Sequence, residues 1–465
     1  MSATLNNITD VILKAREKAF KETSSEPEPG LTQPLEWPIN CTVGPGLEGA
    51  IACETKVGYV NGAKGWLIYR GYNIFDLCAY STYEEVSYLL LHGKLPTQTE
   101  LQAFKDKLHQ HQNIPQTIRL LLGFPIEDMN PMAALKLGTT LMKFEFTDVG
   151  SDAMQEGNAS VISADEDSIA METKPMGEKN AIYEFRRTQR ERTRSEGPSD
   201  DPSGIESCYH LIAGVSTLAA AIARVRKGQL PLEPDSSLSH AGNLIYMMTG
   251  RRPTPLEERV MDVALILHAD HGMNASTFAS MVVASTLSDI YLSVGAGIAA
   301  LNGPLHGGAN EMVIRMLKEI GSVERVKPWL LDAVAHKKKI MGFGHRVYKA
   351  LDPRARVLGP LAKYLTQENP EQGMLFRIAE ALENEVMQTV GKEKKIFPNV
   401  DYYSGIVYAF LGIPKKMFTP MFAVSRVAGW TARVQEYLQN NRIFRPRAMY
   451  TGAFDTQYVP IDKRG

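Results

Sequence analysis

The chain has 465 residues, of which 44% are apolar and 22% are charged, and its formal net charge is −1. A chain of this length and composition forms roughly two or three globular domains with large cores. The near-zero charge argues against binding to nucleic acid or to an anionic membrane through whole-molecule attraction. Its four cysteines show no CxxC or other zinc-like spacing, which favours free thiols in a reducing compartment.

Residues 1–45 predict a short helix followed by a Pro-rich polar linker. The first 20 residues carry charges throughout and lack the apolar stretch of a signal peptide, so we expect a cytoplasmic protein. Apolar-leaning segments such as "VGAGIAAL" are shorter than the roughly 20 residues that span a bilayer, and no membrane partner is expected.

The next segments predict one small β-hairpin. "TKVGYV" and "WLIYRG", which are rich in β-branched and aromatic residues, flank a turn from Asn61 to Gly65. Nearly everything after the hairpin has helical periodicity, and several helices are apolar on most faces, which indicates burial among other helices. Thr82 with Glu85, and Thr97 with Glu100, predict capping boxes. The fold class is therefore predicted to be all-α with a small N-terminal hairpin.

Residues 148–207 interrupt this pattern. They run from an acidic "SADEDS" to a basic "RRTQRERTRS" and lack a core-forming apolar stripe. We interpret them as a solvated surface insertion. A role in binding a partner or nucleic acid is the alternative, which is weakened because opposite charge blocks can pair with each other.

Five of the ten histidines fall between positions 268 and 345. "LNGPLHGGANE" places His306 between a helix-stopping Gly-Pro and the start of an amphipathic helix. His268 and His271 form an H-x-x-H pair at a helix end. No Glu or Cys completes a familiar metal-ligand pattern, so we favour a substrate contact or a buried polar role over a metal site.

Three later segments carry charged candidates. "KIMGFGHRVYKALDPRAR" is a basic, glycine-lined loop that suits a phosphorylated or carboxylated ligand. In "FPNVDYYSG", Asp401 is interpreted from local sequence first as a helix N-cap, with a functional role as the alternative. Arg426 lies inside a buried-looking helix and must be paired by protein or by ligand, whereas Arg445 by itself is typical of a surface loop.

Together these segments resemble the citrate synthase family. The resemblance covers residues 46–455 outside the insertion and rests on seven motifs in family order, namely "GLEGAIACETKVGYVNGAKGWLIYRGY", "SLSHAGNLIYMMTG", "LHADHGMNAST", "LNGPLHGGANE", "GFGHRVYKALDPRA", "FPNVDYYSG" and "RPRAMYTG". It implies a two-domain helical fold that works as a homodimer. The expected domains are a large one, 46–305 with 409–465, and a small one, 306–408, which closes over the cleft.

The resemblance also implies roles for single residues. His306 is similar to the histidine that stabilises the enol of acetyl-CoA, Asp401 to the base that removes a methyl proton, and His345 to the acid that protonates the carbonyl of oxaloacetate. The remaining assignments are oxaloacetate ligands His271, Arg354 and Arg426, the partner-supplied Arg445, and CoA contacts at Gly342, Gly344 and Lys349. No cofactor and no metal are implied, since acetyl-CoA is a substrate.

The chemistry agrees with these roles. A thioester methyl is a very weak acid, so its enolate oxygen needs a positioned donor in a site without water. We expect the dipole of the helix that follows His306 to keep its imidazole neutral, and Gly307 and Gly308 to leave room for the thioester. Several arginines suit a dicarboxylate that must be held in attack geometry.

The predicted activity is the condensation of acetyl-CoA with oxaloacetate and water to citrate and CoA. Three alternatives remain: a 2-methylcitrate synthase that uses propionyl-CoA, an inactive scaffold relative whose charged insertion binds a partner, and, most distantly, a metal-dependent hydrolase.

Overall fold

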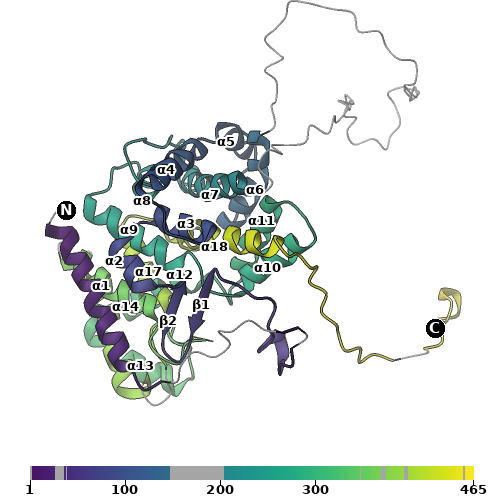
Figure 1. Cartoon of the computed structure of the whole chain (residues 1–465). Coiled ribbons are helices and arrows are strands. Elements are labelled where there is room, and N and C mark those ends of the chain that lie inside the picture. Colours follow the sequence, from purple (N-terminus) through teal and green to yellow (C-terminus); the bar gives the residue numbers. More distant parts are fainter. Residues whose placement is uncertain are drawn as a thin grey trace, which may run out of the picture.

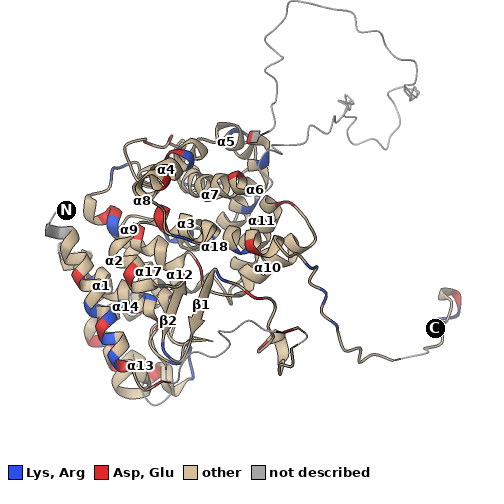
Figure 2. Ribbon diagram, viewed as in Figure 1, with Lys and Arg blue, Asp and Glu red and all other residues tan. Residues whose placement is uncertain are grey.

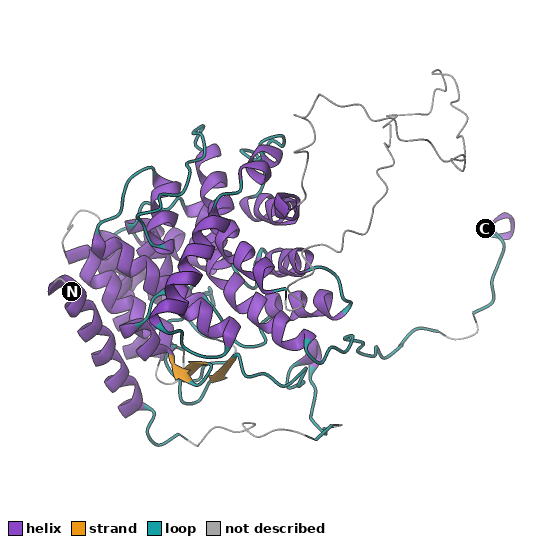
Figure 3. Ribbon diagram, turned by 45° about the horizontal axis from the view of Figure 1, so that its top comes forward, coloured by secondary structure: helices purple, strands orange, loops and turns teal. Residues whose placement is uncertain are grey.

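The structure is a computed structural model that describes residues 3–26, 36–37, 39–146, 204–345, 347–367, 373–391, 396–453 and 456–464. Within these ranges the chain is almost entirely helical, with one small sheet at an edge of the helical body (Figures 1 and 3). This confirms the all-α fold with a small hairpin. The predicted insertion lies outside the described residues except for its last four, and the first helix after it already begins at Ile205, two residues before the expected end of the insertion.

The hairpin is present and gains a third strand that the sequence did not predict. β1 (Gly58–Asn61) pairs antiparallel with β2 (Trp66–Tyr69), and β2 pairs antiparallel with β3 (Tyr72–Asn73). The hydroxyl of Tyr69 donates hydrogen bonds to the carbonyls of Ile266 and Asp270, at 3.1 and 2.9 Å. The sheet is thereby fastened to the end of a central helix.

The first nine described helices are α1 (Ala3–Glu22), α2 (Ile74–Tyr80), α3 (Tyr83–His92), α4 (Gln98–Gln112), α5 (Pro115–Leu121), α6 (Pro131–Leu141), α7 (Ile205–Val225), α8 (His240–Thr249) and α9 (Pro255–His268). They are followed by α10 (Ala275–Ser285), α11 (Ile290–Leu301), α12 (Ala309–Ile320), α13 (Val326–Ala335), α14 (Pro353–Gln367), α15 (Met374–Val386), α17 (Val400–Phe410) and α18 (Phe418–Leu438). Short 3₁₀ turns at Pro45–Leu47, Met142–Phe146, Val323–Arg325, Lys415–Met417 and Ile461–Lys463, and a π-helical turn at Met387–Gly391, complete the described elements.

The core is centred on α7 and α18, which pack on each other and are buried along most of their lengths. Among the described residues, α7 is the one helix long and apolar enough to cross a membrane, with a mean hydropathy of 1.4, and 89% of that stretch is buried inside the fold. This helix is longer than "VGAGIAAL", so the expectation that the apolar segments fall short of a membrane span is wrong for α7 by length and composition. Burial against neighbouring helices accounts for its apolar faces.

The caps show how local sequence sets the helix ends. At α4, Thr97 and Glu100 form the predicted capping box. At α3, Thr82 accepts from the N–H of Glu85 as predicted, but the Glu85 carboxylate accepts from the hydroxyl of Ser81, so the second half of that box is wrong. The Glu85 carboxylate binds the hydroxyl of Ser81 instead of the backbone N–H of Thr82.

Five helices late in the chain form a second group. α12 and α14 both pack on α17, and α13 packs on α15. α1 runs alongside α14 and also packs on α2, so it links the two groups (Figure 1). Figure 2 shows that α1 carries both signs of charge; one of its ion pairs joins Arg16 to Asp76 of α2 at 3.0 Å, and another joins Glu22 to Arg356 of α14.

Candidate active site

The carboxylate of Asp401 is not used to cap its helix, because a different residue is the N-cap. Asn399 is the N-cap of α17, and its side chain accepts from the N–H of Asp401 at 3.0 Å. The prediction that Asp401 is the cap is therefore wrong. Its Oδ1 is buried without a hydrogen-bond partner among the described residues, and burial raises the pKa of this carboxyl to about 6.

The ring of His306 meets the first turn of a different helix from the one predicted. Its Nε2 lies 3.3 Å from the backbone N of Ser276 and 2.9 Å from the Ser276 Oγ, at the start of α10. A backbone N–H can only donate, so Nε2 accepts and the ring proton lies on Nδ1. Burial, with the nearby positive charge of Arg426, lowers the pKa of His306 to about 4. The ring is neutral as predicted, but α12, whose N-cap is Gly308, is not the helix it contacts.

His345 is held in a comparable way by its own loop. Its Nδ1 accepts from the backbone N–H groups of Val347 and Tyr348, at 3.0 and 3.2 Å. Its Nε2 therefore carries the proton as long as the ring is neutral. Burial lowers the pKa of His345 to about 4, so the ring presents one N–H donor near neutral pH.

Arg426 is a fully buried cation on α18 with an unsatisfied side. Its Nε donates to the carbonyl of His268 at 2.6 Å, and its guanidinium lies 4.8 Å from the ring centroid of Phe422. Its Nη2 has no hydrogen-bond partner in the described part of the chain. Burial lowers the pKa of Arg426 to about 10, which leaves it charged at neutral pH. A buried, charged donor without a hydrogen-bond partner is typical of a residue that binds an anionic ligand.

His268, the other member of the H-x-x-H pair, is committed to the protein. Its Nδ1 bonds to the carbonyl of Ala264 at 2.7 Å, and its ring meets Phe422 edge-on at 4.7 Å. Its Nε2 is buried and has no hydrogen-bond partner among the described residues.

Arg354 differs from Arg426 because the protein already neutralises it. Asp352 receives its Nε and Nη2 at 3.0 and 2.8 Å, and both side chains are almost completely buried. The carboxylate of Asp352 also accepts from the backbone of Val400, next to the catalytic candidate Asp401. The pair thus ties the start of α14 to the start of α17.

His271 lies next to His345 and Tyr348. Its Nε2 is 3.2 Å from the hydroxyl of Tyr348, and its ring is 5.3 Å from that of His345. Burial and the positive charges of Arg354 and Arg426 lower the pKa of His271 well below its ordinary value. The structure therefore brings together six of the ten predicted residues: His271, His306, His345, Arg354, Asp401 and Arg426.

The glycine loop before His345 positions that residue through its backbone. Gly342 has φ +80°, and a Cβ there would come within 2.8 Å of Tyr402. The carbonyl of Gly342 accepts from Asn399 at 2.8 Å, and the N–H of Gly344 donates to Phe397 at 2.8 Å. These polar groups are used inside the protein, where they couple the His345 loop to the start of α17. Lys349 is exposed on the same loop.

The two glycines after His306 have different roles. A Cβ on Gly307 would come within 2.3 Å of the carbonyl of Leu301, so this glycine permits close packing of the loop against the end of α11. Around Gly308 there is nothing within 4 Å of such a Cβ. That the two glycines leave room for a thioester stays a prediction.

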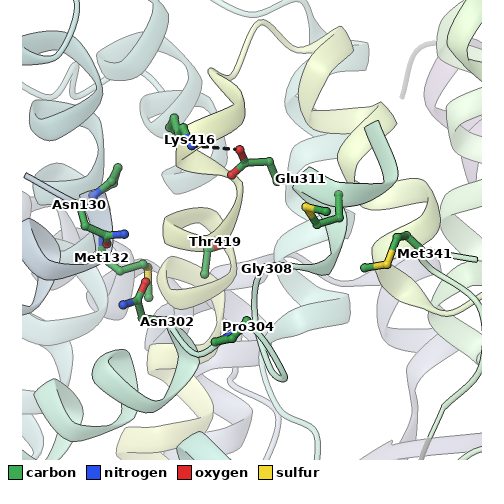
Figure 4. Close-up of a pocket in the computed structure, with 11 residues that line it drawn as sticks. Asn130, Met132, Asn302, Pro304, Gly308, Glu311, Met341, Lys416 and Thr419 are labelled. Carbon is green, nitrogen blue, oxygen red and sulfur yellow. Dashed lines mark hydrogen bonds and ion pairs between the residues drawn. The ribbon is translucent and has the colours of Figure 1, made fainter. Parts of the chain in front are cut away.

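A cleft of about 260 Å³ borders the His306 loop. Pro304 and Gly308 form one side, Met132 comes from α6, and Met341 from the glycine loop (Figure 4). An ion pair between Lys416 and Glu311, at 3.2 Å, spans one end. The cleft therefore borders two loops that carry predicted site residues, the His306 loop and the glycine loop before His345.

Arg445 lies apart from the other site residues. After α18 the chain still packs on α10 through Phe444, whose ring is 5.5 Å from that of Phe278, and then leaves the helical body as an extended segment (Figure 1). Arg445 is exposed on this segment, as are Ile443, Met449 and Tyr450.

Sequence reasoning missed several partners of the site. Ser276, Asn399 and Tyr348 were passed over because Ser, Asn and Tyr are ordinary in turns and helix starts. Asp352, which neutralises Arg354, was missed as well. A buried pair of Asp270 with Arg433, joined by two contacts of 2.7 Å, was also missed. One usable signal was present: Asp270 and Asp352 stand within three residues of candidate cations or histidines.

Fold and site together define a class: an α-helical protein whose buried site gathers one carboxylate of raised pKa, two neutral histidines and an unsatisfied arginine that suits a small carboxylate ligand. The family profile described as "Citrate synthase, C-terminal domain" matches residues 46–447. The chain therefore belongs to the citrate synthase family, and it is an enzyme that makes citrate.

Individual relatives agree. The citrate synthases of Deinococcus radiodurans and Synechocystis sp. are each 40% identical to this chain, over 91% and 90% of it and 99% and 93% of their own lengths. The crystal structure of citrate synthase from Pyrobaculum aerophilum matches with a TM-score of 0.74 and 38% identity, covering 94% of this chain and 100% of that one. The ternary complex of carboxymethyl coenzyme A and oxaloacetate with citrate synthase from Thermoplasma acidophilum matches with a TM-score of 0.73 and 33% identity, covering 89% and 97%. The family and activity predicted from the sequence are confirmed.

Proposed function

We propose that Asp401, His306 and His345 carry out the condensation of acetyl-CoA with oxaloacetate. Asp401 takes a proton from the methyl group, while Nδ1–H of His306 donates a hydrogen bond to the thioester oxygen on which the negative charge develops. The enolate carbon then attacks the carbonyl carbon of oxaloacetate, and the carbonyl oxygen takes the proton from Nε2 of His345. The proton that Asp401 gained replaces it on His345 before the next turnover. Water finally cleaves the citryl thioester and releases citrate and CoA.

One observation carries this proposal: two buried groups of opposite charge are both left unsatisfied in one site. Asp401 Oδ1 and Arg426 Nη2 lack hydrogen-bond partners among the described residues. Each costs free energy unless a ligand completes it. Asp401 Oδ1 can accept the proton of the methyl group, and Arg426 Nη2 can donate a hydrogen bond to a carboxylate of the substrate.

We further propose that oxaloacetate is held by His271, Arg354 and Arg426. The ternary complex of the Thermoplasma acidophilum relative with oxaloacetate and carboxymethyl coenzyme A supports binding of both substrates by this chain. For the thioester arm we propose the cleft between Met132 and Met341, because Pro304 and Gly308, which flank His306 in its loop, line it. Gly342, Gly344 and Lys349 remain our proposal for the CoA nucleotide.

We propose a small domain, 306–408, that closes on the remainder of the chain, and a homodimer in the cytoplasm. The mutual packing of α12, α14 and α17 supports the domain. The extended C-terminal segment supports the dimer, because it exposes apolar side chains such as Met449, which is 90% exposed, beside Arg445. Apolar groups on a projecting segment gain by docking on a second copy, which would carry Arg445 to the partner's site.

Subunit mixing tests the crossing of Arg445. Arg445→Ala and Asp401→Asn variants are each expected to be nearly inactive alone. When they are unfolded together and refolded at equal amounts, half of the dimers are mixed, and each mixed dimer has one intact site, so about a quarter of wild-type activity should return. If Arg445 acts within its own subunit, the mixed dimers have no intact site and activity does not return.

Paired acyl-CoA assays test the acyl substrate. With saturating oxaloacetate, we expect kcat/KM for acetyl-CoA to exceed that for propionyl-CoA by about 10–200-fold, the usual discrimination for one methylene in an apolar pocket. CoA release is measured in both assays. A larger kcat/KM with propionyl-CoA would identify a 2-methylcitrate synthase instead.

A further inference from the structure

Tyr348 contacts three residues of the proposed site although it belongs to none of the assigned roles. Its side chain is 3% exposed. Its ring centroid lies 5.5 Å from that of His271 and 4.8 Å from that of His345, and the guanidinium of Arg354 lies 5.9 Å from it. These three residues come from the end of α9, the glycine loop and the start of α14. Tyr348 is therefore placed where the site's separate parts meet.

The hydroxyl of Tyr348 makes a hydrogen bond to the imidazole of His271. It lies 3.2 Å from Nε2 of His271. Burial keeps both groups neutral, since it raises the pKa of the phenol and lowers that of the imidazole. A neutral imidazole has one proton, and the partner of one nitrogen decides whether the other nitrogen can donate.

The loop that carries Tyr348 is held from outside the site. The N–H groups of Lys349 and Ala350 both donate to the carbonyl of Gly62 in the hairpin turn, at 3.0 and 3.3 Å. A Cβ on Gly62 would lie 2.1 Å from the carbonyl of Val347, so the turn fits closely against the loop. The phenol is thus positioned before substrate arrives, which lowers the cost of ordering on binding.

We propose that Tyr348 is a positioning residue for the oxaloacetate site: its hydroxyl donates to Nε2 of His271 and so holds the imidazole proton on Nδ1, the nitrogen that is left to donate to a substrate oxygen. This inference rests on the proposed role of His271 as an oxaloacetate ligand. If His271 binds oxaloacetate, Tyr348 affects the affinity for oxaloacetate by setting the tautomer of His271.

Tyr348→Phe tests the inference because it keeps the ring and removes only the hydroxyl. We expect the dissociation constant of oxaloacetate, measured by calorimetry, to rise about 3–10-fold, the usual effect of one lost hydrogen bond between neutral groups. KM for acetyl-CoA at saturating oxaloacetate should stay within about twofold of wild type, because a positioning effect confined to His271 leaves that substrate's contacts intact. Tyr291→Phe is the matched control: it removes a buried tyrosine–histidine hydrogen bond of 2.9 Å, to His210, away from the site. It should leave both constants unchanged.

A double-mutant cycle shows whether the effect passes through His271. In a His271→Ala background, Tyr348→Phe should add no further loss of oxaloacetate affinity. Unchanged affinity in the single variant, or an equal loss in both backgrounds, would overturn the inference while leaving the proposed role of His271 in place. If His271→Ala alone leaves the affinity unchanged, the proposed role of His271 fails and the inference falls with it.

Discussion

Asp401→Asn is expected to lower kcat for citrate formation by about 10²–10⁴-fold, the range that general-base catalysis contributes. The amide has nearly the same shape but cannot accept the methyl proton. Oxaloacetate affinity should change little, because the assigned oxaloacetate contacts are His271 and the arginines. Asp332→Asn on the exposed α13 is the matched control and should retain full activity.

The pH profile gives a second check on the same carboxylate. The pKa of Asp401 is raised to about 6, so the base is ionised above this pH and becomes protonated below it. His306 and His345, with pKa values lowered to about 4, stay neutral through that interval. We therefore expect kcat/KM for acetyl-CoA to fall about tenfold per pH unit below pH 6. An acidic limb near 4 would contradict the assignment of a buried base, and a residual activity of Asp401→Asn that keeps the limb at 6 would assign it to another group.

Arg426→Met is expected to weaken oxaloacetate binding without destabilising the fold. Removing one partner of a buried charge pair costs about 2–5 kcal/mol, which corresponds to about a 30-fold or greater rise in the dissociation constant. In the free protein, however, this guanidinium is a buried cation with an unsatisfied Nη2, so an apolar side chain of similar volume removes a desolvation cost. The melting temperature should therefore stay the same or rise.

Arg433→Met provides the contrast from the same helix. Arg433 is also almost completely buried, but Asp270 already pairs with its Nε and Nη2 at 2.7 Å. Its removal leaves a buried carboxylate without its cation and should cost about 3–5 kcal/mol of the free energy of unfolding. Thermal unfolding and calorimetry with oxaloacetate compare the two variants. An equal loss of stability in both would mean that Arg426 serves the fold rather than the substrate.

Local structure followed closely from local sequence. The turn at Asn61 predicted the hairpin, and Thr97 with Glu100 predicted a complete capping box, because each rests on contacts within a few residues. The order of the motifs also identified the family and, by resemblance, named His306, His345 and Asp401. These are statements about residue type and neighbours in the chain, which the sequence contains directly.

Contacts between distant residues decided what the named residues can do. Ser276, 30 positions before His306, sets the tautomer of that histidine, and no local pattern predicts the pairing. The sequence predicts that Arg426 must be paired by protein or by ligand. Only the folded structure leaves its Nη2 without a partner among the described residues, while Asp352 pairs with Arg354 and Asp270 pairs with Arg433. The sequence alone determined the helices, the hairpin and the list of reactive side chains. The tertiary structure decided which of those side chains stay unsatisfied, because burial and charge compensation depend on groups that meet only after folding.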